Sequence, residues 1–86
     1  MARLTYTVLL EPDPDEGGFT GTVPELPGCI TQGESFEEAL ALARDAIALH
    51  VEGLAEDGLP VPIERVAPQL ASVEVDVNSA VGVHVA

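Results

Sequence analysis

Polar and apolar residues alternate along residues 3–11 of the chain. The apolar positions of this segment are Leu4, Tyr6, Val8 and Leu10, with Thr5 and Thr7 between them. A period of two residues places one set of side chains on each face of an extended chain, and this pattern is typical of a strand that is buried on one face. The sequence therefore predicts a first strand over residues 3–11.

Two further strands are predicted, because turn-forming residues divide the next part of the chain into short segments. The stretch PDPDEGG at residues 12–18 contains two prolines, which cannot donate to a ladder, and two glycines, which tolerate positive φ. It is expected to reverse the chain, so that a second strand from Phe19 to about Val23 forms an antiparallel hairpin with the first. The stretch PELPG ends this strand, and residues 29–32 are long enough for a short third strand.

A long amphipathic helix is predicted after Ser35. In the spacing S-x-x-E, the Ser35 hydroxyl accepts from the backbone N–H of Glu38, and the Glu38 carboxylate accepts in return from the N–H of Ser35. Apolar residues then recur every three or four positions, at Phe36, Leu40, Ala43, Ile47, Val51 and Leu54. Gly58 suits the C′ position, and Pro60 and Pro62 prevent the helix from resuming. The predicted helix covers residues 36–57.

Alternation returns near the C-terminus and predicts a fourth strand. Its apolar positions are Val73, Val75 and Val77, and the same parity continues at Val81, Val83 and Val85. Two interpretations stay open for the last part: a tail with an apolar bias, or an extra strand that pairs with the edge of another chain. The expected fold class is α+β, in which a small antiparallel sheet with one packed helix follows the order β-β-β-α-β. Residues 1–77 are then the domain, and residues 78–86 a tail or an extra strand used in oligomerisation.

Composition limits both the core and the partners. Tyr6, Phe19 and Phe36 are the only aromatic residues among 86, so Val, Leu, Ile and Ala must fill the core. A single domain of this size has a narrow stability margin, which assembly with other subunits would widen. Fifteen Asp and Glu residues oppose three Arg and no Lys, and the net charge is −12. This charge argues against direct nucleic-acid binding and favours cationic partners, although a solvated acidic coat is the simpler explanation of the composition.

The chain offers few candidates for chemistry. Cys29 is its single cysteine, so no internal disulfide is possible. Neither His50 nor His84 stands in a recognisable relation to Cys29 as the base that a cysteine nucleophile needs, and Cys29 is interpreted as a small packed hydrophobe. His50 is expected to be partly buried on the helix, and His84 to be a tail residue. The N-terminus lacks the apolar block of a signal peptide and no run is long enough to span a membrane, so a cytoplasmic location is expected.

The acidic run at the first turn raises the question of a metal site. Asp13, Asp15 and Glu16 precede two glycines, but the run lacks the twelve-residue spacing, the terminal bidentate Glu and the flanking helices of a calcium loop. A solvated hairpin tip is the preferred interpretation. Two-metal nucleases need carboxylates from the middles of neighbouring elements, and the first strand has none between Arg3 and Glu11. No catalytic residue, metal or cofactor is predicted, and a metal-dependent nuclease is kept as a third hypothesis.

Several motifs in a fixed order resemble the HicB-like domain family, also called UPF0150. They are Y-x-V-x-L at residues 6–10, DEGGFT at residues 15–20, VPELPGCITQGES at residues 23–35, EEAL at residues 37–40, and EDGLPVP at residues 56–62. The resemblance covers about residues 3–77. It implies a partial, degenerate ribonuclease-H-like β-β-β-α-β fold without catalytic carboxylates.

The same resemblance implies a function. Members of this family are best known as antitoxins of type II toxin–antitoxin systems, which bind and neutralise a small basic HicA-type mRNA interferase and usually oligomerise. Many also carry a C-terminal DNA-binding segment. Only nine residues follow Val77, so direct DNA binding is not expected here. A homo-oligomeric structural or regulatory domain without a toxin partner is the alternative.

Six carboxylates are candidates for contact with a basic partner. They lie on the expected solvent side of the helix and in the loops before it: Glu25, Glu34, Glu37, Asp45, Glu52 and Glu56. The resemblance does not assign these contacts. They are chosen because an acidic surface attracts a cationic RNase and speeds its association; an ordinary solvated face is the alternative for any one of them.

Overall fold

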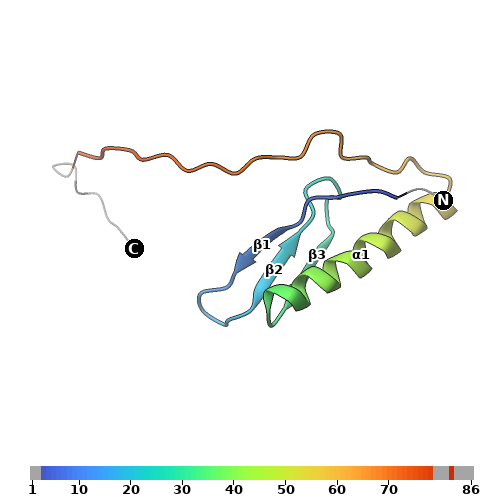
Figure 1. Ribbon diagram of the computed structural model, residues 1–86, viewed down its shortest axis with the longest axis horizontal. Helices are drawn as coiled ribbons and strands as arrows, with labels where there is room; N and C mark the ends of the chain where they lie inside the picture. The colour runs from blue at the N-terminus through green and yellow to red at the C-terminus, as the bar shows by residue number, and fades with distance from the viewer. Residues whose placement is uncertain (1–2, 79–81, 83–86) are drawn as a thin grey trace.

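The computed structural model describes residues 3–78 and 82, which form a three-stranded sheet, one helix and a long extended segment (Figure 1). The elements are β1 (Leu9–Pro12), β2 (Phe19–Thr22), β3 (Ile30–Gly33) and α1 (Phe36–Glu56). The strands follow the order β1-β2-β3, and both pairs are antiparallel. The α+β class and the order β-β-β-α are therefore confirmed.

Strand β1 begins at Leu9, so the prediction that the first strand starts at Arg3 was wrong. The antiparallel register pairs Leu9 with Thr22, the last residue of β2. After Thr22 the chain leaves β2 and enters the loop 23–29, where Pro24 has no N–H to donate to a ladder. Residues 3–8 consequently have no ladder with β2, and Tyr6 and Thr7 bond instead to the chain that follows α1.

The turn between β1 and β2 is closed by backbone and side-chain bonds. The Asp13 N–H donates to the Gly18 carbonyl, and the Gly17 N–H donates to the Asp13 carbonyl. Gly17 and Gly18 both have φ of 79°, which glycine adopts without the steric cost of a Cβ. The predicted chain reversal is thus confirmed, with the two glycines at the positions that need positive φ.

Both ends of α1 are capped. Ser35 is the N-cap, and its hydroxyl accepts from the Glu38 N–H at 3.1 Å as predicted. The reciprocal bond differs from the prediction, because the Glu38 carboxylate accepts from the N–H of Glu34 at 2.9 Å. At the C-terminus, Gly58 has φ of 69° and donates to Ala55, while Leu59 donates to Leu54. These two bonds form a Schellman motif, which confirms Gly58 as the C′ residue.

Helix α1 packs closely over β2 and β3 through small residues. Ala39 and Ala43, on the inner side of the helix, are fully buried. A Cβ built on Gly33 would lie 2.4 Å from the backbone nitrogen of Ala39, so a side chain at this position would push the helix away. Phe19 and Phe36 flank this contact edge to face, with ring centroids 6.0 Å apart.

The core continues under the second half of α1, where the loop between β2 and β3 folds inward. Val23, Leu26 and Cys29 are its buried members, and Tyr6, Val8, Ala46, Ile47 and Val51 pack around them. The loop holds its shape through bonds between its own members: Val23 N–H to the Cys29 carbonyl, Leu26 N–H to Val23, and Cys29 N–H to Leu26. Burial of Cys29 among apolar side chains agrees with its interpretation as a packed hydrophobe.

The predicted fourth strand is absent from the described single chain. Residues 66–77, called the arm below, are exposed and extended and form no strand. The exposed fractions are 86% for Val73, 75% for Val75 and 54% for Val77. A valine-rich segment gains a ladder and buries its side chains only beside a sheet edge, and in Figure 1 the arm runs past the sheet instead of pairing with it. Val81, Val83 and Val85 lie outside the described residues.

Candidate partner-binding surface

Four of the predicted acidic contacts lie on the solvent face of α1. Glu37, Asp45, Glu52 and Glu56 are all exposed. At 100° per residue they fall within an arc of about 100°, on the side of the helix opposite Ala39 and Ala43, and they span about 28 Å along the axis. The fold therefore brings together an acidic helix face, defined here as these four residues.

The two predicted loop acids lie at opposite ends of β3. Glu34 is exposed beside the N-terminus of α1, next to the acidic helix face. Glu25 is half-buried in the loop between β2 and β3, where its carboxylate interacts electrostatically with the Tyr6 phenol. Burial of the phenol, followed by the nearby Glu25 carboxylate, raises the pKa of Tyr6. Of the six candidates, five thus belong to one end or face of the helix, and Glu25 stands apart from them.

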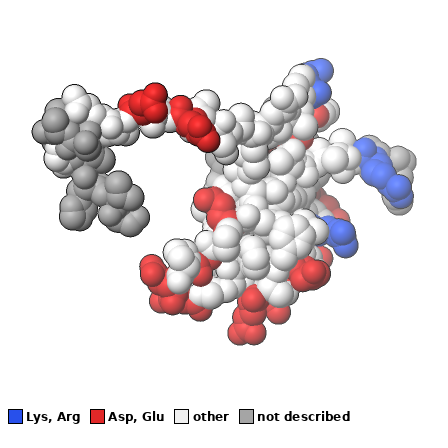
Figure 2. All heavy atoms as spheres, turned by 60° about the vertical axis from the view of Figure 1, so that its left-hand side comes forward, with Lys and Arg blue, Asp and Glu red and all other residues white. Residues whose placement is uncertain are grey.

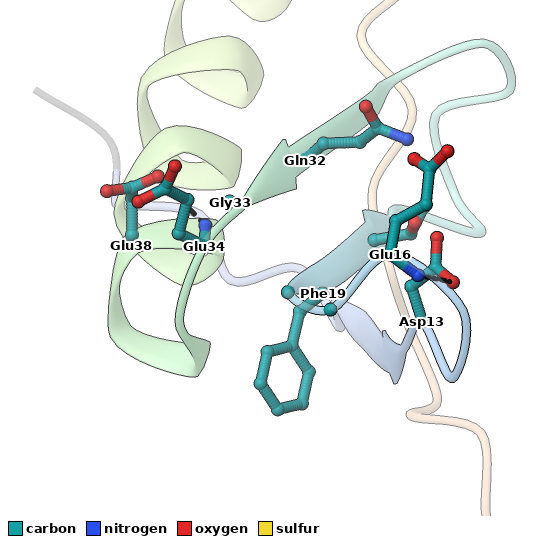
Figure 3. A pocket seen from close by; sticks show the side chains of 10 residues that line it. Asp13, Glu16, Phe19, Gln32, Gly33, Glu34 and Glu38 are labelled. Atoms are coloured by element: carbon teal, nitrogen blue, oxygen red, sulfur yellow. Dashed lines mark hydrogen bonds between the residues drawn. The ribbon is translucent and has the colours of Figure 1, made fainter.

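A further acidic surface was missed by the sequence reasoning. A hollow of about 420 Å³ opens where the turn between β1 and β2 meets the start of α1 (Figure 3). Its carboxylates are Asp13, Glu16, Glu34 and Glu38. Asp13 and Glu16 approach from one side and Glu34 and Glu38 from the other, with the ends of β2 and β3 between them. The hollow is called the acidic hollow below.

The acidic hollow exists because two turns approach closely at one end of the sheet. The hairpin register places Phe19 opposite Gly33, and a Cβ on Gly18 would lie 2.5 Å from the Gly33 carbonyl oxygen. Glycine at both positions lets the turns come together. The register of β2 and β3 was the signal that could have revealed the hollow, since it sets residues 13–18 beside residues 33–34.

The carboxylates of the acidic hollow are partly engaged by backbone donors. The Asp13 carboxylate accepts from the N–H groups of Asp15 at 2.9 Å and Glu16 at 3.1 Å. These bonds favour the ionised form and hold the pKa of Asp13 below its ordinary value. Asp13 therefore shapes the turn, in agreement with the solvated hairpin tip. Among the described residues, no group of three or more His, Cys, Asp or Glu side chains is placed to hold a metal ion.

Of the three arginines, Arg44 lies on α1 itself and borders the acidic helix face. Arg3, Arg44 and Arg65 are each exposed. In Figure 2 most of the carboxylates in view gather on the lower part of the folded body, whereas the arginines lie toward its right-hand margin. At 100° per residue Arg44 lies about 20° from Glu37, so it borders the acidic helix face. A cationic partner thus meets a surface that is mainly negative, and such a field raises the rate of association.

The histidine predictions have different outcomes. His50 is exposed, so the expectation of partial burial was wrong. In the second half of α1, Ile47 and Val51 pack against the buried residues of the inward loop, and His50 is not among the residues that do so. His84 lies outside the described residues.

These features define the class of protein: a small α+β scaffold that presents acidic surfaces on its helix and at one end of its sheet. No helix in the described part of the chain is long and apolar enough to cross a membrane. Residues 6–85 match the family described as HicB-like antitoxin of bacterial toxin–antitoxin system. The chain belongs to this family, as its motifs indicated.

Individual relatives agree with this assignment. A UPF0150 protein of Synechocystis sp. is 48% identical over 59 residues, which cover 69% of this chain and 73% of that protein. A UPF0150 protein of Thermoplasma acidophilum is 39% identical over 59 residues, covering 69% of this chain and 84% of the relative. Antitoxin HicB 1 of Photorhabdus laumondii is 40% identical over 61 residues, covering 71% of this chain but 39% of that antitoxin. The match thus covers less than half the length of this named antitoxin.

Proposed function

We propose that this chain is a non-catalytic antitoxin-like module that binds and neutralises a small basic HicA-type mRNA interferase in the cytoplasm. Membership of the HicB-like antitoxin family supports the proposal, and the acidic helix face is the observation that carries it. This face exposes four carboxylates in one stripe along the helix, those of Glu37, Asp45, Glu52 and Glu56. An RNase that binds RNA phosphates needs a basic surface, which is complementary to this stripe.

The mechanism is competition for the basic surface of the toxin. Negative charge on α1 would attract the toxin at long range and raise the association rate, more strongly at low ionic strength. Once docked, the helix carboxylates would pair with the Lys or Arg side chains that otherwise hold RNA phosphates. The acidic hollow, adjacent to the start of α1, extends the same negative surface toward β1 and β2. Inhibition then needs no chemistry from this chain.

Titration of RNA cleavage tests the proposal. The proposal predicts that a small basic RNase is encoded beside the gene for this chain. Cleavage of a fluorescent RNA by that RNase is measured at 50 and 300 mM salt with increasing amounts of this protein. The triple variant E37Q/D45N/E52Q should weaken inhibition at low salt by about tenfold or more, because it removes three charges from the docking face.

The matched control removes the same number of charges elsewhere. E11Q/E74Q/D76N changes three exposed acids that lie off the helix, and it should weaken inhibition by less than about threefold, through the long-range field alone. Equal losses in both triples would show that total charge, and not the helix face, governs binding. Absence of inhibition by the unmodified protein at low salt would contradict the proposal itself.

The alternative function is a homo-oligomeric structural or regulatory domain with no toxin partner. The exposed valines of the arm favour self-association, and the fourth strand of the expected ribonuclease-H-like β-β-β-α-β order would then form only in the assembled protein. The two functions respond to salt in opposite directions. Toxin binding between opposite charges weakens as salt rises, whereas association of two acidic chains strengthens.

A further inference from the structure

We propose that the basic partner of this chain lays an amphipathic helix along α1, on a row of four residues called the seam below: Leu42, Ala46, Leu49 and Gly53. The inference rests on the proposed function and deepens it, because it states which kind of element docks and which apolar contact holds it. Three features of the described residues carry it: exposed leucines on α1, carboxylates beside them at a matching spacing, and a glycine with open space above it.

The seam has the spacing of a helix–helix contact. Steps of four, three and four residues separate its members, and this alternation keeps one side of a helix turned toward a neighbouring helix. At 100° per residue the seam occupies an arc of about 60° and about 17 Å of the helix axis. It lies entirely within α1, which runs from Phe36 to Glu56. A partner helix of about three turns would thus contact its whole length.

The two leucines of the seam are exposed. Leu49 has an exposed fraction of 74% and Leu42 one of 41%. Neither packs around the core cluster of the described residues, whereas Ala46 does. Ala46 therefore marks the inner edge of the seam, and the leucines form its solvent side. Single apolar side chains are common on protein surfaces, but two leucines seven residues apart form one strip on the same side of a helix.

The seam lies on the side of α1 that faces away from β1. Arg44 and Ile47 line a groove together with Leu4, which belongs to the segment before β1, so they mark the β1 side of the helix. Leu42 lies about 160° around the helix axis from Arg44. The one arginine of α1 is therefore remote from the seam, and no Lys or Arg of the helix repels a cationic partner there.

Carboxylates follow the outer edge of the seam. Glu38, Asp45 and Glu52 are exposed and stand seven residues apart, and the last two directly precede Ala46 and Gly53. In a helix pair, charges at this position meet the charges that flank the apolar row of the facing helix. The three carboxylates thus select a helix with Lys or Arg beside its apolar row. A second copy of this chain is disfavoured as the occupant, because it has the same carboxylates and a net charge of −12.

Gly53 marks the place where a partner helix can approach most closely. Glycine inside a helix is less favourable than alanine, and α1 itself does not require it, because a Cβ at this position would meet nothing within 4 Å. Gly33 differs, since its Cβ would collide with the helix backbone. Small residues at a contact let two helix axes approach to about 8 Å. Larger apolar side chains of the partner would then fill the space over Gly53 and Ala46.

The seam and the acidic helix face would have different effects on the kinetics of binding. Exposed carboxylates steer the encounter and raise the association rate, but exposed ion pairs add little to the affinity of a formed complex. Leu42 and Leu49 would lose their contact with water on docking, and buried apolar contacts of this kind slow dissociation. The inference therefore predicts that substitutions in the seam change the dissociation rate, whereas charge substitutions change mainly the association rate.

A synthetic helix tests the seam without the RNase. The probe is a fluorescent peptide of three heptads with Ile and Leu in its apolar row and Arg on both flanks, and its control is a scrambled peptide of the same composition. The full chain should bind the heptad peptide at least about tenfold more tightly than the scrambled one at 150 mM salt, because both have the same charge and only one has a continuous apolar row. Leu42→Gln with Leu49→Gln should remove this preference and raise the dissociation rate by about tenfold or more.

Two further sets of variants separate docking from folding. Val66→Gln with Leu70→Gln changes exposed apolar residues of the arm and should alter the dissociation rate by less than about twofold. Gly53→Gln should raise the melting temperature, because Gln favours the helix, and yet speed dissociation by about fivefold, because its side chain occupies the approach to α1. Gly53→Ala should stabilise the helix with a smaller effect on binding. Loss of binding in a more stable protein cannot result from unfolding.

The same variants in the RNA cleavage assay distinguish the inference from the proposed function. A Leu42 and Leu49 variant that inhibits the RNase as well as the unmodified chain does would overturn the seam and leave the proposed function in place. Equal binding of the heptad and scrambled peptides would also overturn the seam, as would self-association of this chain that depends on Leu42 and Leu49. Selection of the heptad peptide by a chain that inhibits no basic RNase would support the seam and contradict the proposed function alone.

Discussion

The folded body, formed by the sheet and the helix, and the arm contain the same alternating pattern of side chains but differ in how far these side chains are buried. In the body, Tyr6, Val8 and Leu10 occupy alternate positions and are half-buried. Tyr6 and Val8 pack against the core, and Leu10 pairs with Gly21 of β2. In the arm, Val73 and Val75 alternate in the same way and remain exposed. The difference is not hydrophobicity. It is whether a neighbouring strand lies within reach along the chain.

This comparison shows what an alternating pattern specifies. Alternation assigns side chains to two faces, but it does not name the partner strand. The body obtains its partners from two short connections, the glycine turn before β2 and the inward loop before β3. The arm follows a 21-residue helix and two prolines, and no tight turn in the described residues returns it to an edge. Three sets of substitutions would break or sharpen the comparison.

The largest effect is expected from removing the same side chain in each region. Leu26 has an exposed fraction of 0% and Leu70 one of 85%. Leu26→Ala should lower the free energy of unfolding by about 2–5 kcal/mol, because it leaves a cavity in a small core. Leu70→Ala should change it by less than about 0.5 kcal/mol. Chemical denaturation of both variants at low protein concentration provides the measurement, and a large loss for Leu70→Ala would mean that the arm is packed.

An intermediate effect is expected where the helix meets the sheet. Gly33→Ala places a Cβ against the Ala39 backbone, and the resulting displacement of α1 should cost about 1–3 kcal/mol. Gly53→Ala is the matched control, since its Cβ would meet nothing within 4 Å. It should stabilise the helix by up to about 1 kcal/mol. Thermal unfolding of the two variants should therefore shift in opposite directions; a neutral Gly33→Ala would show that α1 does not approach β3 this closely.

The smallest effect is expected at the junction between body and arm. Bonds from the Thr7 hydroxyl and then the Thr7 N–H lower the pKa of Glu64. A lowered pKa means that this contact stabilises the fold above the ordinary glutamate pKa, and that the contribution is lost as the pH falls through the folded-state pKa. In denaturant at pH 7, Glu64→Gln should thus unfold slightly earlier than the unmodified chain, and the difference should narrow as the pH falls below the ordinary glutamate pKa. A difference that does not change with pH across the acid range would exclude this titration as its cause.

The candidate site was predictable where it depends on one element. Helical periodicity is enough to place Glu37, Asp45, Glu52 and Glu56 on one exposed face, and the structure has them there. The acidic hollow was not predictable in the same way, because Asp13 and Glu38 meet only through the register of three strands and the approach of two turns. Likewise, His50 fits the apolar side of the helix by spacing, yet it is exposed, and Ile47 and Val51 make the packing in this part of α1.

The sequence by itself determined the local elements of this protein: the Ser35 cap, the Gly58 stop, the glycine turn after β1 and the α+β class. Each of these depends on bonds between residues a few positions apart, which the order of residues fixes directly. Only the tertiary structure decided that β1 begins at Leu9, that the two acidic turns enclose a hollow, and that the valines of the arm have no partner within the described chain. These outcomes depend on which backbone segments come close together. A periodic pattern can require a neighbouring strand, but the distance along the chain decides whether one can be reached.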